Sequence, residues 1–221
     1  MLADSPLRAA RQAAALSQHA AAARLGVSQP YYSQLESGTR TLPPDLAARA
    51  VRKLGVTPGA LPVPALSPTW RPVSPDRLAS ALAALGYPPF AHLRRPATGK
   101  NPALVVAGVL AHSDADVRLV EALPWVLSKF PDLNVEWLAA QSRLLNLQNR
   151  LGYVITLTTH SSHLATLLRD LEASRLAAEG TLCRDSMPRA ERDWVRRNRP
   201  SAASHWRLLT TLTREQLPHD A

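Results

Sequence analysis

The sequence contains a single cysteine, Cys183, among its 221 residues. One cysteine excludes an intrachain disulfide and any zinc module built on several thiolates. The longest nearly unbroken apolar run, Pro102 to Ala111, is far shorter than the roughly 20 residues of a membrane-spanning helix, and no apolar stretch follows a basic start at the N-terminus. These absences favour an unexported protein of the reducing cytoplasm, with no membrane partner.

Catalytic signatures are missing as well. The sequence has no HExxH, GxxxxGK or GxSxG motif, and Cys183 has no adjacent histidine, although its neighbour Arg184 would lower the pKa of the thiol. Metal sites can be drawn from two groups, which are His112, Asp114 and Asp116, and the i, i+3 pair His160 and His163. Nothing in the sequence forces a metal site, and residues 159–163 are interpreted more simply as a polar break between helices, with Ser161 or Ser162 capping the second. We expect no enzymatic activity, no metal and no cofactor.

Acidic residues are scarce relative to basic ones. Lys and Arg number 26 against 17 Asp and Glu, which gives a formal net charge of +9. A basic surplus of this kind favours a polyanionic partner. Hydrophobic residues make up 46% of the chain, enough to bury a core and to exclude disorder throughout.

The prolines divide the chain. Six of the 19 lie between Thr57 and Asp76, whereas none lies between Asp132 and Met187. Proline fixes φ and lacks an amide donor, so the rich segment is predicted to be extended and semi-rigid. We expect an N-terminal domain over residues 1–57, a linker over 58–75 and a C-terminal domain over 76–221.

The C-terminal domain is predicted to be all α, as is the whole chain. Leucines after Leu144 recur at i, i+3, i+4 and i+7, and no stretch alternates as strands do. Helix boundaries are predicted from the following residues: Ser74 as a start and Gly86 as an end, Asn101 as a start, Ser113-Asp114 and Asp132 as further caps, and Pro124 and Pro131 as breaks.

The segment from Leu7 to Val56 carries the strongest pattern. Ser17 is placed to cap a short helix ending at Leu25, Gly26 supplies a left-handed stop, and Ser28 caps the next helix. Two helices joined by so tight a turn must cross steeply, as in a helix-turn-helix. In the second helix Tyr32 and Leu35 face inward, which leaves uncharged hydrogen-bonding side chains outside: Gln29, Ser33, Gln34 and Ser37. Glutamine can make a bidentate pair with adenine, so this face suits base edges.

This segment of about 50 residues resembles the phage-repressor (Xre/Cro-type) helix-turn-helix, and the resemblance rests on the motifs LSQ, RLGVSQ, YSQLESG and a later LGV. The resemblance implies that the helix from Ser28 to Glu36 enters the major groove, with Gln29 and Gln34 on bases and Gln18, Ser37 and Arg40 on phosphates. The full predicted DNA-binding set is Gln18, Ser28, Gln29, Tyr31, Ser33, Gln34, Ser37 and Arg40. The resemblance also implies a buried, structural Arg11–Glu36 ion pair.

Some positions depart from the family pattern. Ala21 stands where the family has Leu, and Tyr32 where it has Ile or Val, which suggests that a larger ring fills the space left by a smaller residue. Pro30 occupies a second base-reading position, where it offers only apolar contact, so sequence preference cannot be carried over from relatives. The alternative is a helix-turn-helix used only for packing.

The net positive charge of residues 1–63, with seven basic and three acidic side chains, favours a role in DNA binding over a role in packing alone. A domain this small and weakly charged rarely binds tightly alone, so we expect a homodimer or a partner-assisted complex on double-stranded operator DNA.

The C-terminal half gives weaker signals. It resembles helix-turn-helix antitoxins that accompany AbiE-like nucleotidyltransferase toxins, through the motifs NPALVVAG, LNLQNRLGYVITL and SHWRLLTTL. This resemblance implies a cognate toxin as partner. Four tryptophans lie in this half and either fill its core or form an interface: Trp125, Trp137, Trp194 and Trp206. Six arginines between residues 184 and 199 lie among three acids, and such a mixture is either a clamp for an anionic partner or a solvated face with internal ion pairs.

The function expected from these patterns is sequence-specific transcriptional regulation, with the protein acting as a repressor of its own promoter. The alternative is an antitoxin that neutralises its toxin by protein contact through the C-terminal half.

Overall fold

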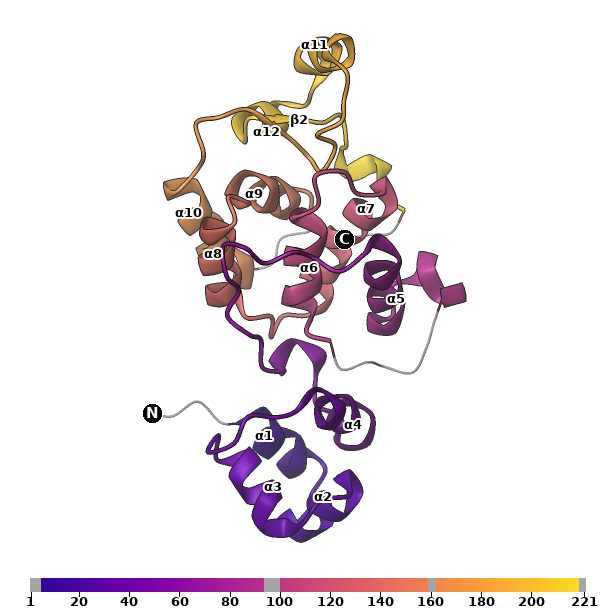
Figure 1. Cartoon of the computed structure of the whole chain (residues 1–221), viewed down its shortest axis with the longest axis vertical. Coiled ribbons are helices and arrows are strands. Elements are labelled where there is room, and N and C mark those ends of the chain that lie inside the picture. Colours follow the sequence, from indigo (N-terminus) through magenta and orange to yellow (C-terminus); the bar gives the residue numbers. More distant parts are fainter. Residues whose placement is uncertain (1–4, 94–99, 159–161, 219–221) are drawn as a thin grey trace.

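The computed structural model describes residues 5–93, 100–158 and 162–218, and it confirms a mostly helical chain. Figure 1 shows an elongated molecule with the N-terminal helices at one end. These elements are α1 (Pro6–Ala13), α2 (Gln18–Leu25), α3 (Gln29–Glu36), α4 (Pro44–Leu54) and the 3-10 turn η1 (Pro58–Ala60).

The larger remainder of the chain forms a second group of helices (Figure 1). Its elements are α5 (Pro75–Leu85), η2 (Pro88–Leu93), α6 (Pro102–Leu110), α7 (Val117–Lys129), α8 (Val135–Leu144), α9 (Gln148–Thr156), α10 (Ser162–Ala173), β1 (Gly180–Thr181), α11 (Arg189–Asn198), α12 (Ser201–His205), β2 (Leu208–Leu209) and η3 (Arg214–Gln216). The strands β1 and β2 pair in parallel, Gly180 with Leu208 and Thr181 with Leu209. Strands of two residues are too short to produce the alternating pattern that predicts a strand.

Several predicted helix boundaries are confirmed. Ser17 and Ser28 accept hydrogen bonds from Ala20 N and Tyr31 N, and Asn101 accepts one from Ala103 N. The two glycine stops have left-handed backbone, with φ of 71° at Gly26 and 97° at Gly86. These signals are local, which is why the sequence contains them.

Three predicted boundaries are wrong. Helix α7 is capped by Asp116, whose carboxylate accepts from Arg118 N, while Asp114 instead accepts from Ser186. Helix α8 is capped by Asn134, and Asp132 accepts a hydrogen bond from Thr57.

The third wrong boundary is Pro124, which lies inside α7 and does not end it. Its ring is buried beside Leu123 and Val126, so core packing holds the helix together across the missing amide. Pro131, by contrast, does fall between α7 and α8.

Buried apolar side chains fall into separate clusters. One cluster joins α1 to α4 and reaches Leu61, and a larger one joins the helices from α5 to α10 with Trp206 and β2. Helix α6, the apolar run from Pro102, is buried on nearly every side and forms the centre of the larger cluster. A third, small cluster of Met187, Val195 and Leu209 lies beneath α11.

The proline-rich segment runs along the C-terminal helices (Figure 1). Buried Asn101 donates from Nδ2 to the carbonyls of Gly59 and Leu61, at 3.0 and 2.6 Å. Further along, Leu66 N donates to Gln141 Oε1 at 3.1 Å. The Trp137 indole donates to Pro64 O at 2.9 Å, and His112 Nε2 lies 2.9 Å from Val73 O. Side chains from the larger helical group therefore hold this segment along its length. None of the helices in the described ranges is long and apolar enough to cross a bilayer.

Candidate nucleic-acid interface

Helix α3 lies at the end of the molecule farthest from α11 (Figure 1). The turn that sets its angle to α2 needs the left-handed backbone of Gly26, where a Cβ would meet Arg49 Nη1 at 3.2 Å. Arg49 also donates to Leu25 O at 2.6 Å, so α4 holds the C-terminal end of α2. Gly26 thus permits the turn between α2 and α3, and Arg49 fastens the end of α2 to α4.

The predicted Arg11–Glu36 pair is confirmed. Arg11 donates from Nε and Nη2 to Glu36 Oε1 at 3.0 and 2.8 Å, and the Glu36 side chain is only 1% exposed. The hydrogen bond to Glu36 raises the pKa of Arg11 above its ordinary value. Arg11 also donates to Leu16 O at 3.0 Å, so it joins α1, the α1–α2 turn and α3. It is a structural residue of the helix-turn-helix.

The second oxygen of Glu36 extends this network to the predicted DNA-facing side chains. Gln18 Nε2 donates to Glu36 Oε2 at 2.6 Å, and Gln29 Nε2 donates to Gln18 Oε1 at 2.9 Å. A continuous chain of hydrogen bonds therefore runs from Arg11 through Glu36 and Gln18 to Gln29. Gln29 keeps its carbonyl oxygen and one N–H for a base edge, which is the set that a bidentate adenine pair requires.

The remaining predicted residues lie around the exposed side of α3. Gln34, Ser37 and Arg40 are exposed, whereas Tyr31 and Ser33 are half-buried. Exposed Ser28 uses its hydroxyl as the helix cap. The predicted set thus lies on α3, at the start of α2 and in the loop after α3.

The loop after α3 is ordered by contacts that sequence spacing does not reveal. The Arg40 guanidinium lies 5.1 Å from the centre of the Tyr31 ring, and Arg40 N donates to Gln34 O at 3.0 Å. The Ser37 and Thr39 hydroxyls are 2.8 Å apart. Thr39, which is exposed beside Ser37, was not predicted, and no pattern in the sequence marks it.

Tyr32 and Ala21, the two positions that depart in size from the family pattern, both lie in the N-terminal apolar cluster. Tyr32 is fully buried and donates from its hydroxyl to Leu7 O at 3.2 Å, and Ala21 is fully buried in the same cluster. Burial raises the pKa of Tyr32. The tyrosine therefore fills the core and also satisfies a carbonyl at the start of α1.

We expect Tyr32→Ile to lower the free energy of unfolding by about 1–3 kcal/mol, because it removes both ring volume and the hydrogen bond to Leu7. Thermal unfolding of the variant, followed by circular dichroism, measures the loss. Tyr32→Phe, which deletes only the hydroxyl, should lose less. An unchanged melting temperature for Tyr32→Ile would show that the ring does not support the domain.

Comparison with protein families identifies this part of the chain. A helix-turn-helix family model, HTH_3, matches residues 7–61. Residues 7–61 are an Xre/Cro-type helix-turn-helix, the class of domain that binds DNA. The match ends at Leu61, the last residue of the N-terminal apolar cluster. Comparison with curated proteins and with solved structures gave no match.

The metal site drawn from His112, Asp114 and Asp116 is not assembled. In the described residues no group of three or more His, Cys, Asp or Glu side chains is placed to hold a metal ion. His112 bonds to the proline-rich segment, Asp114 accepts from the Ser186 amide and hydroxyl at 2.8 and 2.5 Å, and Asp116 caps α7. His160, with the predicted cap Ser161, lies outside the described residues.

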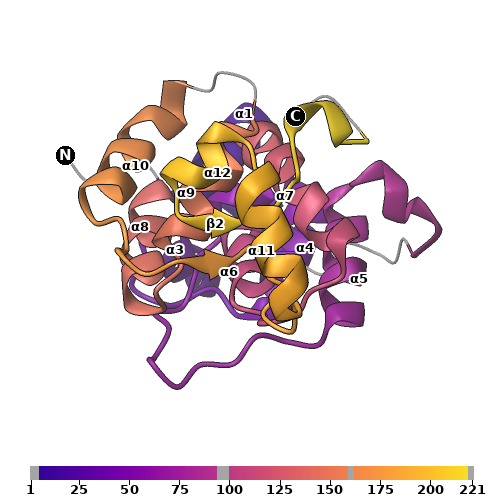
Figure 2. The ribbon, with the colours of Figure 1, turned by 90° about the horizontal axis from the view of Figure 1, so that it is seen from above.

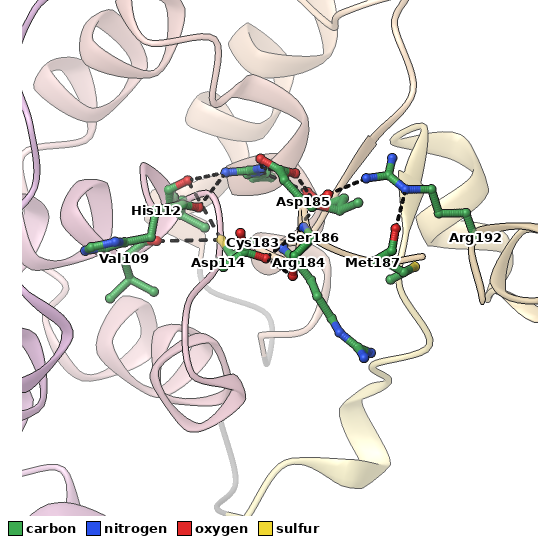
Figure 3. A network of polar contacts seen from close by, with 12 residues as sticks. Val109, His112, Asp114, Cys183, Arg184, Asp185, Ser186, Met187 and Arg192 are labelled. Atoms are coloured by element: carbon green, nitrogen blue, oxygen red, sulfur yellow. Dashed lines mark hydrogen bonds and ion pairs between the residues drawn. The ribbon is translucent and has the colours of Figure 1, made fainter. Parts of the chain in front are cut away.

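Cys183 lies in a polar network that fastens the loop after β1 to the turn after α6 (Figure 3). Its thiol donates weakly to Val109 O at 3.6 Å and is buried. The expectation of a lowered thiol pKa is wrong, because burial raises the pKa of Cys183 to about 11, and the charge that opposes this rise is that of Arg150 and not of Arg184. Arg184 is exposed and pairs with Glu191 instead.

The raised pKa predicts an inert thiol. At pH 8 we expect the native chain to react with a disulfide reagent roughly a hundredfold more slowly than the chain in urea, because a pKa of about 11 leaves far less thiolate than the ordinary pKa of an exposed cysteine. Absorbance of the released thiolate measures both rates. Equal rates in buffer and in urea would contradict the buried placement of Cys183.

The tryptophans of the C-terminal half divide between core and surface. Trp206 is buried, Trp125 packs against Tyr87 and Phe130, and half-buried Trp137 bonds to Pro64. Trp194 is different, with 53% of its surface exposed.

The arginine-rich stretch contains internal ion pairs. Arg184 pairs with Glu191, Arg196 with Asp193 and Glu179, and Arg199 with Glu179. Arg196, through its hydrogen bond, and Arg199 hold the pKa of Glu179 below its ordinary range.

Proposed function

We propose that the protein is a sequence-specific transcriptional regulator that acts in the cytoplasm and represses its own promoter. The observation that carries the proposal is α3: it belongs to a domain of DNA-binding class and presents Gln34, with Gln29 held by Gln18, outside the core. Glutamine amides can pair with the edge of adenine, and cationic side chains in the flanking loop can bind phosphates. Exposed Arg40, seated over Tyr31, is the phosphate-binding cation of this surface.

A homodimer is part of the proposal. Helix α3 has eight residues and can read only one short half-site, and the domain carries few cations. Two copies on one face of the duplex, about one helical turn or 34 Å apart, would double both the bases read and the phosphates neutralised. The operator would then be a palindrome.

Substitutions at the two glutamines test the assignment of α3. Gln29→Ala and Gln34→Ala should each lower preference for the operator over scrambled DNA by about 1–3 kcal/mol, because each removes a base-reading amide. Fluorescence anisotropy with labelled duplexes measures both affinities. Gln12→Ala, which removes an exposed glutamine from α1, is the matched control and should change neither.

Arg40→Ala provides a separate readout. It should weaken binding to operator and scrambled DNA alike and flatten the salt dependence, because a phosphate contact carries no sequence information. Unchanged selectivity in both glutamine variants would reject α3 as the recognition helix.

A second candidate, an antitoxin that neutralises a nucleotidyltransferase-type toxin by protein contact, is favoured by one observation. Trp194 is exposed on α11, at the end of the molecule opposite α3 (Figure 1). A protein bound there would leave α3 free for DNA. The two candidates separate by copurification with the product of a neighbouring gene.

A further inference from the structure

We propose that α11 and the hollow beside it form a docking site for a protein segment that carries one bulky apolar side chain flanked by acidic residues. The site does not depend on the proposed repressor function, because α11 and α3 lie at opposite ends of the long axis (Figure 1). Figure 2, which looks down that axis, shows α11 in front of the helices that separate it from the N-terminal domain.

The hollow provides the apolar part of the site. It has a volume of about 480 Å³ and lies between α7, β2 and α11, with Val117, Val120, Met187, Trp194 and Val195 among its lining residues. Val117 is 58% exposed and Trp194 is 53% exposed, the two largest exposures among the large hydrophobic residues described. Large apolar side chains at the mouth of a concave surface are typical of protein-binding sites.

The hollow itself selects an uncharged anchor. Glu121 lines it without a salt bridge among the described contacts, and burial raises the pKa of its carboxyl group. Arg184 and Glu191 also line the hollow, where they pair with each other at 2.6 Å. A partner carboxylate inside would meet Glu121 and Glu191, while the only cation of the described lining is already engaged, so we expect an acidic side chain of the partner to stay outside.

The arginines around α11 provide the charge complementarity. Between residues 184 and 199 there are six arginines and three acids. In the described part of the chain, Arg189, Arg192 and Arg197 have no carboxylate partner, and Arg192 donates only to the carbonyls of Met187 and Asp185. Arg197 follows Trp194 by three residues and so lies on the same side of α11. An acidic residue next to the anchor can therefore reach Arg197.

Helix α11 is held in place before any partner binds. Figure 3 shows Arg192 bonded to the loop that carries Met187, at 2.8 Å, and the same loop bonded through Ser186 to Asp114. Arg184 joins this loop to Glu191 at 2.6 Å. A fixed helix lowers the entropic cost of binding, which favours a docking site over a loosely attached helix.

Selection of phage-displayed random peptides on the full-length chain tests the proposal. The expected consensus is one Leu, Phe, Ile or Trp flanked by Asp or Glu. A fluorescent consensus peptide should bind Trp194→Ala and Arg197→Glu about tenfold or more weakly than the unaltered chain, by anisotropy. Arg143→Glu, a charge reversal at an exposed arginine of α8, and Leu144→Ala, at an exposed apolar residue, are the matched controls and should bind normally.

Other outcomes overturn the proposal. A peptide consensus without acidic residues would contradict the proposed docking site. Equal affinity of the consensus peptide for Trp194→Ala and for the unaltered chain would also contradict it. Concentration-dependent dimers that Trp194→Ala abolishes would assign the surface to a second copy of the chain. Competition by duplex DNA, with weaker DNA binding in Arg197→Glu, would assign it to a nucleic acid. Circular dichroism and operator binding of Trp194→Ala are measured alongside. If both are unchanged, weaker peptide binding by this variant reports a loss of docking and not a loss of folding or of DNA binding.

Discussion

Replacing Glu36 with alanine is expected to remove about 3–5 kcal/mol from the free energy of unfolding of the helix-turn-helix domain. The substitution leaves the Arg11 guanidinium, which is 17% exposed, without its carboxylate. It also takes away the acceptor of Gln18 Nε2 and the ion-pair partner of Arg8, so three side chains lose a buried partner in one step. This is the largest stability effect that we expect for a single polar residue in the domain.

Hydrogen exchange of the α1 to α4 amides measures this loss in the full-length chain, because it reports on the domain separately from the C-terminal helices. Gln12→Ala serves as the control, since it alters an exposed side chain one residue from Arg11. Protection of the Glu36→Ala variant equal to that of Gln12→Ala would contradict the central role of the ion pair. The same variant should also bind the operator more weakly, because Gln18 and Gln29 lose their fixed positions.

Gly152→Ala is the second substitution with a large expected effect. Gly152 is buried in α9, where a Cβ would lie 2.3 to 2.5 Å from three ring atoms of Trp206. The ring is rigid and buried, so either the tryptophan or α9 must shift. We expect a loss of about 3 kcal/mol, the upper end of ordinary overpacking costs. Urea unfolding, followed by tryptophan fluorescence, measures it.

A second glycine and a double variant make this test specific. At Gly180 a Cβ would meet nothing within 4 Å, so Gly180→Ala should leave stability nearly unchanged. Adding Trp206→Leu to Gly152→Ala should cost less than the sum of the two single losses, because the smaller side chain makes room for the methyl group. Strict additivity of the two losses would show that Gly152 and Trp206 are not in close contact.

The helix-turn-helix could be predicted because its determinants are close together in the sequence. Ser17, Gly26 and Ser28 each act within a few residues, and Tyr32 and Leu35 mark the buried side of α3 by their spacing. The position of Gln29, by contrast, depends on Gln18 and Glu36, which meet only after folding. The resemblance supplied the Arg11–Glu36 pair, which spacing alone does not.

The C-terminal half was predictable only in outline. Arg150 donates to the carbonyls of Leu110, His112 and Thr181, which are 31 to 40 residues away in the sequence. No local pattern marks such a residue. The raised pKa of the Cys183 thiol could not be predicted for the same reason. It results from burial by segments that are distant in the sequence, and the charge of the adjacent Arg184 does not offset it.

Binding of the purified chain to its own upstream DNA, compared with scrambled DNA over a series of salt concentrations, tests the central proposal most directly. We expect a salt-sensitive preference for the upstream DNA, because base contacts add to phosphate contacts. Equal affinity for both duplexes at every salt concentration would contradict sequence-specific repression by this chain.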